Sequence, residues 1–278
     1  MNTLKPEKRL AVLSALVEGN SIRSTSRMTG VHKTTIAKLL VEVGSQCACL
    51  LDAKMRNLHC EAIEADEVWT FVKKKEAKLT RQEKRNGSQL GDQYVFVALD
   101  PDTKLVPVFV VGKRNAEVTG QFVQELRSRI NNHPQITTDG FLPYLVAIEE
   151  AFGSGVHYAT LVKTYAAEDP GAGRYSPPKV SGVEITRVSG NPEAKRICTS
   201  YVERNNLTMR LALKRLNRLT LAFSKKLENL KAALSLHFAY YNFCRIHGSL
   251  RVTPAMAAGI TNRLWTLEEL ITSKCSQY

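Results

Sequence analysis

The first 45 residues carry apolar positions at helical spacing. Leucines three residues apart follow Pro6 and predict a helix over residues 6–18, which Gly19 ends. Residues 21–40 continue with two shorter helical patterns on either side of Gly30, a residue that suits a tight turn. This arrangement predicts a helix-turn-helix module, with a three-helix interaction module as the alternative.

After residue 60 the pattern changes to strands. Strand-like runs cover residues 62–72, 94–100, 105–112, 135–139 and 156–165, and helical patterns cover residues 115–132 and 142–152. This order is that of a ribonuclease-H-like α/β core, with a mixed five-stranded sheet and flanking helices. We interpret the polar stretch 73–92 as a mobile loop or short helix, and the Gly-, Pro- and Ser-rich stretch 169–192 as a surface loop. A helix carrying Glu203 and a last helix over residues 224–244 complete the pattern.

The patterns divide the chain into four predicted parts. They are an all-α helix-turn-helix module at residues 1–45, a connector at 46–61, the ribonuclease-H-like domain at 62–221 and a C-terminal helical extension at 222–278.

Positive charge is concentrated in one part of the sequence. The chain has a net charge of +13. The segment from Lys195 to Arg251 holds twelve Lys and Arg residues against two Glu residues, so it carries 12 − 2 = +10. A solvated helix face usually mixes both signs, and this bias therefore favours a polyanionic partner, double-stranded DNA.

Two groups of side chains are candidates for contacts with DNA. The second helix of the helix-turn-helix offers polar and basic side chains to a major groove: His32, Lys33, Thr34, Thr35 and Lys38. The later helix offers cations to phosphates: Arg204, Arg210, Lys214, Arg215 and Arg218.

Three carboxylates are candidates for a metal site. Asp66 lies inside the strand-like run 62–72, Asp139 ends the run 135–139, and Glu203 heads the basic helix. Two strand aspartates and a helical glutamate can supply oxygen ligands to a pair of Mg²⁺ ions. The alternatives are three unrelated surface acids, or a Glu203 that serves only the helix dipole.

Neighbouring acids and thiols have other interpretations. Glu64 and Glu67 are the nearest substitutes for Asp66, whereas Asp100 and Asp102 have the composition of a turn. Zinc binding by thiols is conceivable, but their spacing fits no common zinc pattern; these thiols are Cys47, Cys49 and Cys60. The absence of a long apolar run and of a signal-peptide core predicts a cytoplasmic protein without a membrane partner.

Together these motifs resemble the DDE transposases of bacterial insertion sequences, and most closely the insertion-sequence-one type. The matching stretches cover about residues 60–260: residues 65–69, 138–140, 202–206 with Arg210, 218–226, and the tail 241–254. The resemblance implies a catalytic triad of Asp66, Asp139 and Glu203.

The resemblance also implies a mechanism. The triad would hold two Mg²⁺ (or Mn²⁺) ions, and a homo-oligomer on DNA would cleave transposon ends and join them to a target. Two other classes stay open. One is a helix-turn-helix transcriptional regulator, and the other is a ribonuclease-H-type nuclease that never joins strands.

Overall fold

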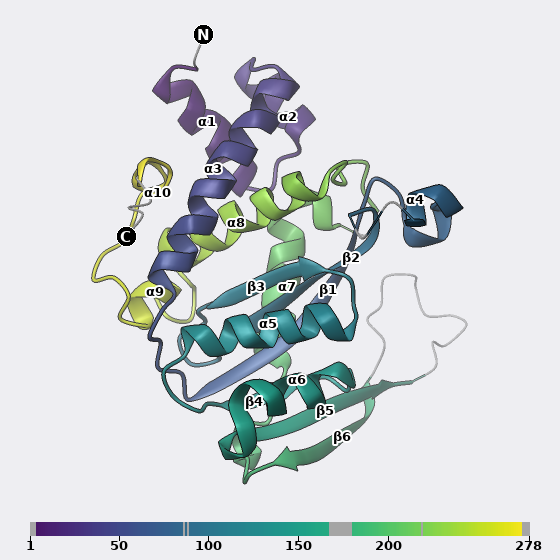
Figure 1. Cartoon of the computed structure of the whole chain (residues 1–278). Helices are drawn as coiled ribbons and strands as arrows, with labels where there is room; N and C mark the ends of the chain where they lie inside the picture. Colours follow the sequence, from purple (N-terminus) through teal and green to yellow (C-terminus); the bar gives the residue numbers. More distant parts are fainter. Residues whose placement is uncertain (1–3, 86, 88, 167–179, 218, 274–278) are drawn as a thin grey trace.

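The computed structural model describes residues 4–85, 87, 89–166, 180–217 and 219–273. A six-stranded mixed sheet forms the centre of the chain, in the order β3-β2-β1-β4-β5-β6 (Figure 1). The strands are β1 Ala62–Val72, β2 Gly91–Leu99, β3 Val108–Gly112, β4 Gln135–Thr138, β5 His157–Tyr165 and β6 Val180–Ser189. β1 pairs antiparallel with β2 and parallel with β4, and β4 pairs parallel with β5. This α/β architecture is compatible with a ribonuclease-H-like fold.

The first five strands lie where the sequence pattern predicts them, but the number of strands was wrong. β6 lies inside the stretch predicted as a surface loop, residues 169–192, and pairs antiparallel with β5. The β-branched residues Val183, Ile185 and Val188 favour an extended chain even though each is more than 40% exposed. Six of the eleven Gly, Pro and Ser residues in 169–192 lie before residue 180, outside the described residues.

Helices cover both faces of the sheet. α5 (Ala116–Arg129) and α6 (Pro143–Phe152) pack together on one face, and α7 (Ser200–Ala212) contacts β1 and β2. Figure 1 shows α5 in front of the sheet and α7 behind it. Phe122 of α5 contacts Phe96 of β2 in the core, with ring centroids 5.7 Å apart. The stretch 73–92 contains two short helical segments, Glu76–Lys78 and α4 (Arg81–Arg85).

The N-terminal part consists of α1 (Pro6–Val17), α2 (Ile22–Thr29) and α3 (Lys33–Lys54). Gly30 ends α2 with φ +70°, and His32 caps α3 by accepting a hydrogen bond from Thr34 N–H. The order of α2, turn and α3 is the one expected of a helix-turn-helix, and its DNA-binding role stays a prediction.

α3 runs through the boundary that we predicted between residues 45 and 46, so much of the predicted connector 46–61 is helix. The reason is that its apolar positions continue to Leu50 and Leu51, which are buried. α3 is long and apolar enough to cross a membrane, but it packs along α8 (Leu227–Phe243) as a core helix does. At the crossing, a Cβ on Gly44 would lie 2.5 Å from Ala232, so only glycine permits this approach.

The chain ends with α9 (Pro254–Ala257) and α10 (Leu267–Thr272), which pack on α8 and, for α10, also on α3. The apolar stripe of α8 is buried, as its spacing predicted. The C-terminal extension and the N-terminal helices therefore share one hydrophobic core with the sheet.

Candidate functional site

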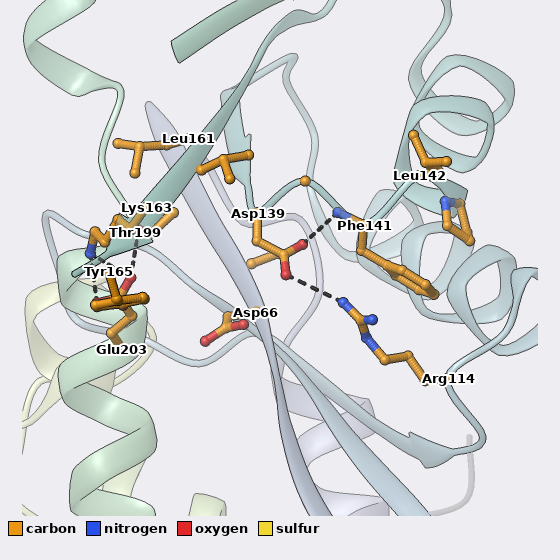
Figure 2. A pocket seen from close by; sticks show the side chains of 14 residues that line it. Asp66, Arg114, Asp139, Phe141, Leu142, Leu161, Lys163, Tyr165, Thr199 and Glu203 are labelled. Atoms are coloured by element: carbon orange, nitrogen blue, oxygen red, sulfur yellow. Dashed lines mark hydrogen bonds and ion pairs between the residues drawn. The ribbon is translucent and has the colours of Figure 1, made fainter. Parts of the chain in front are cut away.

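A cavity of about 770 Å³ lies beside Ala65 and Asp66 inside β1 and the end of β4, and the first turn of α7 borders it. Asp66, Asp139 and Glu203 all line it (Figure 2). The pairing of β1 with β4 explains how the two aspartates meet. Ala65 lies opposite Thr138 in this parallel register, so the residues that follow them, Asp66 and Asp139, are neighbours across the two strands.

The tightest acidic cluster contains a residue outside the predicted triad. Ligand oxygens of Asp66, Glu67 and Asp139 all lie within 4.8 Å of one another. Glu203 lines the same cavity but is not a member of this cluster. Three carboxylates this close repel one another, and a hard cation relieves such repulsion.

Asp66 is held by two hydrogen bonds. Its Oδ1 accepts from Glu67 N–H at 2.8 Å, and its Oδ2 accepts from the Asn206 amide at 2.8 Å. Burial first, and then the nearby charges of Asp139 and Glu203, raise the pKa of Asp66 from 3.8 to about 6 against the effect of those two bonds. The carboxylate is therefore costly to ionise without a cation.

Arg114 supplies positive charge to the cluster. Its guanidinium donates to Glu67 Oε2 at 3.0 Å and lies 3.4 Å from Asp139 Oδ2, while it stacks 3.7 Å from the centre of the Phe141 ring. Figure 2 shows the Arg114 side chain reaching across to Asp139. Burial raises the pKa of Glu67 to about 7 even beside this arginine.

Glu203 lies across the cavity in a pair with Lys163 of β5. The Lys163 ammonium is 2.6 and 2.7 Å from the two carboxylate oxygens, and the Thr199 hydroxyl donates to Oε1 at 2.8 Å (Figure 2). Glu203 thus has a cation as its partner in this structure, as Asp139 has Arg114, whereas Asp66 is held by the Glu67 N–H and the Asn206 amide.

Glu64 has a different role. Its Oε2 accepts a hydrogen bond from Val202 N–H at 2.9 Å, in the first turn of α7, and the residue is 1% exposed. Burial raises its pKa to about 7. Glu64 therefore anchors α7 on β1 and fixes the position from which Glu203 reaches the cavity.

The residues predicted for the major groove lie on the first turns of α3. His32, Lys33, Thr34 and Lys38 are exposed, and Thr35 is half-buried. The structure therefore leaves four of these five side chains accessible to a partner.

The cations predicted on the later helix divide into two groups. Arg204 and Lys214 are exposed. Arg210 donates to Leu216 O at 3.1 Å, and Arg215 donates to Ser224 Oγ and Asn229 O, both at 2.9 Å. Arg215 thus fastens the segment after α7 to the start of α8, a structural role, and burial lowers its pKa to about 10. Arg218 lies outside the described residues.

Two of the thiols considered for zinc, Cys47 and Cys60, are buried, and burial raises the pKa of each to about 12. Among the described residues, neither thiol belongs to a group of three side chains close enough to share a metal ion.

Sequence reasoning missed Arg114 and Lys163. Arg114 follows β3 immediately before the first turn of α5, and Lys163 is a charged residue inside the strand β5. A lysine that directly follows the apolar pair Leu161 and Val162 of this strand was the available signal for Lys163, and its partner could be found only from the fold.

No protein-family model and no curated protein matches this chain. One solved structure with similarity to it is described as "Mos1 transposase paired-end complex with left transposon end", at 16% sequence identity and a TM-score of 0.21. The alignment covers 54% of this chain and 57% of that chain, so this chain spans little more than half of the transposase subunit. A TM-score this low does not establish a common fold, and no property of the site is inferred from this similarity.

Proposed function

We propose that the protein is a metal-dependent DNA transposase with a ribonuclease-H-like core, of the DDE type and related to the insertion-sequence-one group. The observation that carries the proposal is the meeting of Asp66 and Asp139 on adjacent parallel strands, with Glu203 across the same cavity. These acids are far apart in sequence, since 139 − 66 = 73 and 203 − 139 = 64.

The donor set fits divalent cations. Mg²⁺ and Mn²⁺ prefer carboxylate oxygens, and the oxygens of Asp66, Glu67 and Asp139 lie close enough together to share one ion. Asp66 and Asp139 would hold such ions together with Glu203 or Glu67. When bound, the ions would activate water for cleavage or a 3′-hydroxyl for joining, and stabilise the leaving oxygen.

The protein's own groups have separate tasks in this proposal. The Asn206 amide orients the Asp66 carboxylate, and the Phe141 N–H orients Asp139 by donating to its Oδ1 at 2.9 Å. Arg114 and Lys163 border the cavity and can donate to phosphate oxygens of a DNA strand. Glu203, which pairs with Lys163 in this structure, would be the ligand supplied by α7.

The test is a cleavage assay with the full-length protein. The substrate is a supercoiled plasmid carrying the DNA that flanks the gene on both sides, incubated with Mg²⁺, with Mn²⁺ or with EDTA. We expect nicked or linear products, and joined products, only with a divalent ion. Each of the variants Asp66→Asn, Asp139→Asn and Glu203→Gln should lose them while still binding DNA.

Glu61→Gln is the matched control, because the side chain of Glu61 is 65% exposed and lies outside the cavity. Its products should equal those of the wild type. Sequence-specific DNA binding without metal-dependent cleavage would favour a transcriptional regulator. Cleavage without joining would favour a nuclease of the ribonuclease-H type.

A further inference from the structure

A second cavity of about 410 Å³ lies on the other side of α7. Tyr201, Arg204, Asn205 and Thr208 line it, and this spacing places all four on one face of the helix. Glu203 projects instead into the first cavity. One helix thus separates the two cavities.

The opposite wall is built from parts of the chain distant in sequence. It consists of Lys104 in the β2–β3 turn and of the segment after α8, including Arg245 and His247. Lys104 has φ +60°, and its carbonyl accepts a hydrogen bond from the Tyr241 hydroxyl at 2.9 Å. Its ammonium group lies 3.5 Å from the centre of the Tyr201 ring. This left-handed conformation is uncommon for lysine and is held in place by α8.

The lining is strongly basic. It contains Lys104, Arg204 and Arg245 and neither Asp nor Glu. Burial lowers the pKa of His247, and the positive charges of Lys104 and Arg245 lower it further. Within the part of the chain that the structure describes, the side chains of Arg204 and Arg245 make no hydrogen bond or ion pair. Because these cations have no acidic partner in the cavity, they would attract an anionic ligand.

The acids nearest to Lys104 are engaged elsewhere. Asp100 accepts hydrogen bonds within its own turn, from Asp102 N–H at 2.9 Å and from the Thr103 hydroxyl at 2.7 Å. Asp102 pairs with Arg196 at 2.9 Å, and Glu64 accepts from the backbone of α7. None of these acids lines the cavity.

Asn205 supplies a second, independent observation. It is 5% exposed, and among the described residues neither its amide nitrogen nor its amide oxygen has a hydrogen-bond partner. Burying an amide without hydrogen-bond partners destabilises the folded state. A ligand in the cavity that accepts from the Asn205 Nδ2 would remove part of this cost.

We propose that this cavity holds a backbone phosphate of duplex DNA. The lining offers ammonium, guanidinium, amide and hydroxyl donors, the set that binds phosphate oxygens. The proposal rests on the proposed function for the choice of DNA. The phosphate held here lies across α7 from the carboxylates, so it anchors the duplex and does not react.

The experiment is fluorescence anisotropy with a random-sequence duplex in EDTA, which requires no chemistry at the carboxylates. The variant is Arg204→Ala with Arg245→Ala in the full-length chain. The control is Lys54→Ala with Arg187→Ala, which also removes two exposed cations but lies outside both cavities. Thermal unfolding of each variant verifies that it is folded.

We expect the Arg204/Arg245 variant to bind roughly tenfold more weakly at about 0.1 M salt, and the slope of log K against log[salt] to fall by about 2. Asn205→Asp preserves side-chain size but adds negative charge, and it should weaken binding too. The control should change neither quantity by a comparable amount. Equal losses in the control and the test variant would attribute the effect to net charge and overturn the proposal, as would unchanged binding by the test variant.

A second arm separates DNA from free phosphate. Inorganic phosphate is added at constant ionic strength, and the unfolding temperature of the wild type is compared with that of the Arg204/Arg245 variant. Phosphate could stabilise the wild type but not the variant, while the variant still binds the duplex as the wild type does. This result would assign the cavity to free phosphate and refute the proposal that it holds a DNA phosphate. Duplex binding that depends on the cavity in a protein without cleavage activity would refute the proposed function and leave this inference standing.

Discussion

Replacing the buried carboxylate of Asp66 should make the metal-free protein more stable at neutral pH. The perturbation is Asp66→Asn, which keeps the shape and removes the charge. Burial first, and then the charges of Asp139 and Glu203, raise the pKa of Asp66 from 3.8 to about 6. The folded state therefore binds this proton more tightly than the unfolded state does.

The sign follows from this difference in proton binding. Below pH 3.8 the carboxyl is protonated in both states and has no effect. As the pH rises through 3.8 to about 6, the unfolded chain releases the proton first, so stability falls and stays reduced above pH 6. The loss is on the order of 3 kcal/mol, since 6 − 3.8 = 2.2 and each pH unit corresponds to about 1.4 kcal/mol.

The hydrogen bonds around Asp66 tolerate the change. Oδ1 can still accept from Glu67 N–H, and the new amide nitrogen would face Asn206. The Asn206 Oδ1 has no partner among the described residues, so a flip of that amide supplies the acceptor. The gain from removing the charge is therefore retained.

The assay is thermal and urea unfolding of both proteins in EDTA at pH 4.5 and pH 7.5. At pH 7.5 the variant should unfold roughly 6–12 °C higher, and at pH 4.5 the difference should be much smaller. Mg²⁺ should then raise the unfolding temperature of the wild type but not of the variant. Glu61→Gln, at an exposed carboxylate, should change the free energy of unfolding by less than about 0.5 kcal/mol. A variant no more stable than the wild type at pH 7.5, or an equal gain at both pH values, would falsify the reasoning.

Three further predictions concern packing and charge. Gly44→Ala should lower the free energy of unfolding by about 1–3 kcal/mol or more, because the new Cβ would lie 2.5 Å from Ala232. The control is Gly120→Ala, which also lies in a helix but has nothing within 4 Å of its Cβ position and should stabilise the protein slightly. Equal effects of the two substitutions in urea unfolding would contradict the close crossing of α3 and α8. Arg215→Ala should destabilise the fold because it removes the bonds to Ser224 and Asn229, whereas Lys214→Ala should leave stability unchanged; equal unfolding midpoints would refute the structural role of Arg215. Lys33→Ala with Lys38→Ala should weaken binding of the full-length protein to DNA from the transposon ends, measured by fluorescence anisotropy. Unchanged binding would show that another region of the protein recognises the DNA sequence.

The strands that carry the site could be predicted because their apolar runs are bounded by turns. Asp66 lies in β1, and Asp139 directly follows β4, as the pattern indicated. β6 escaped prediction because its residues are exposed on both faces and the Gly-, Pro- and Ser-rich stretch before it dominates the local composition. The pattern left the end of α3 open. The module boundary was placed at residue 45, where the helix-turn-helix ends, with a helix as one option for the connector, and packing on α8 continues α3 to Lys54.

The partners of the acids depend on the fold and could not be read from spacing. Glu67 enters the cluster beside Asp66, although neighbouring residues of a strand usually point to opposite faces. Arg114 reaches this cluster from the β3–α5 connection and Lys163 reaches Glu203 from β5. Such contacts join residues on different elements, so a single sequence identifies the acids but not the cations that face them.

The four consecutive polar residues Glu203, Arg204, Asn205 and Asn206 gain a physical explanation from the two cavities. A helix turns by about 100° per residue, so four neighbours point in four directions and cannot all lie on one face of α7, which packs on β1 and β2. Glu203 lines the first cavity and Asn206 donates a hydrogen bond to Asp66, whereas Arg204 and Asn205 line the second cavity. An ordinary core helix would place apolar residues on at least one of these faces. The polar run therefore marks a helix with a separate polar site on each side, and this requirement explains why the stretch lacks the apolar stripe that makes α8 easy to predict.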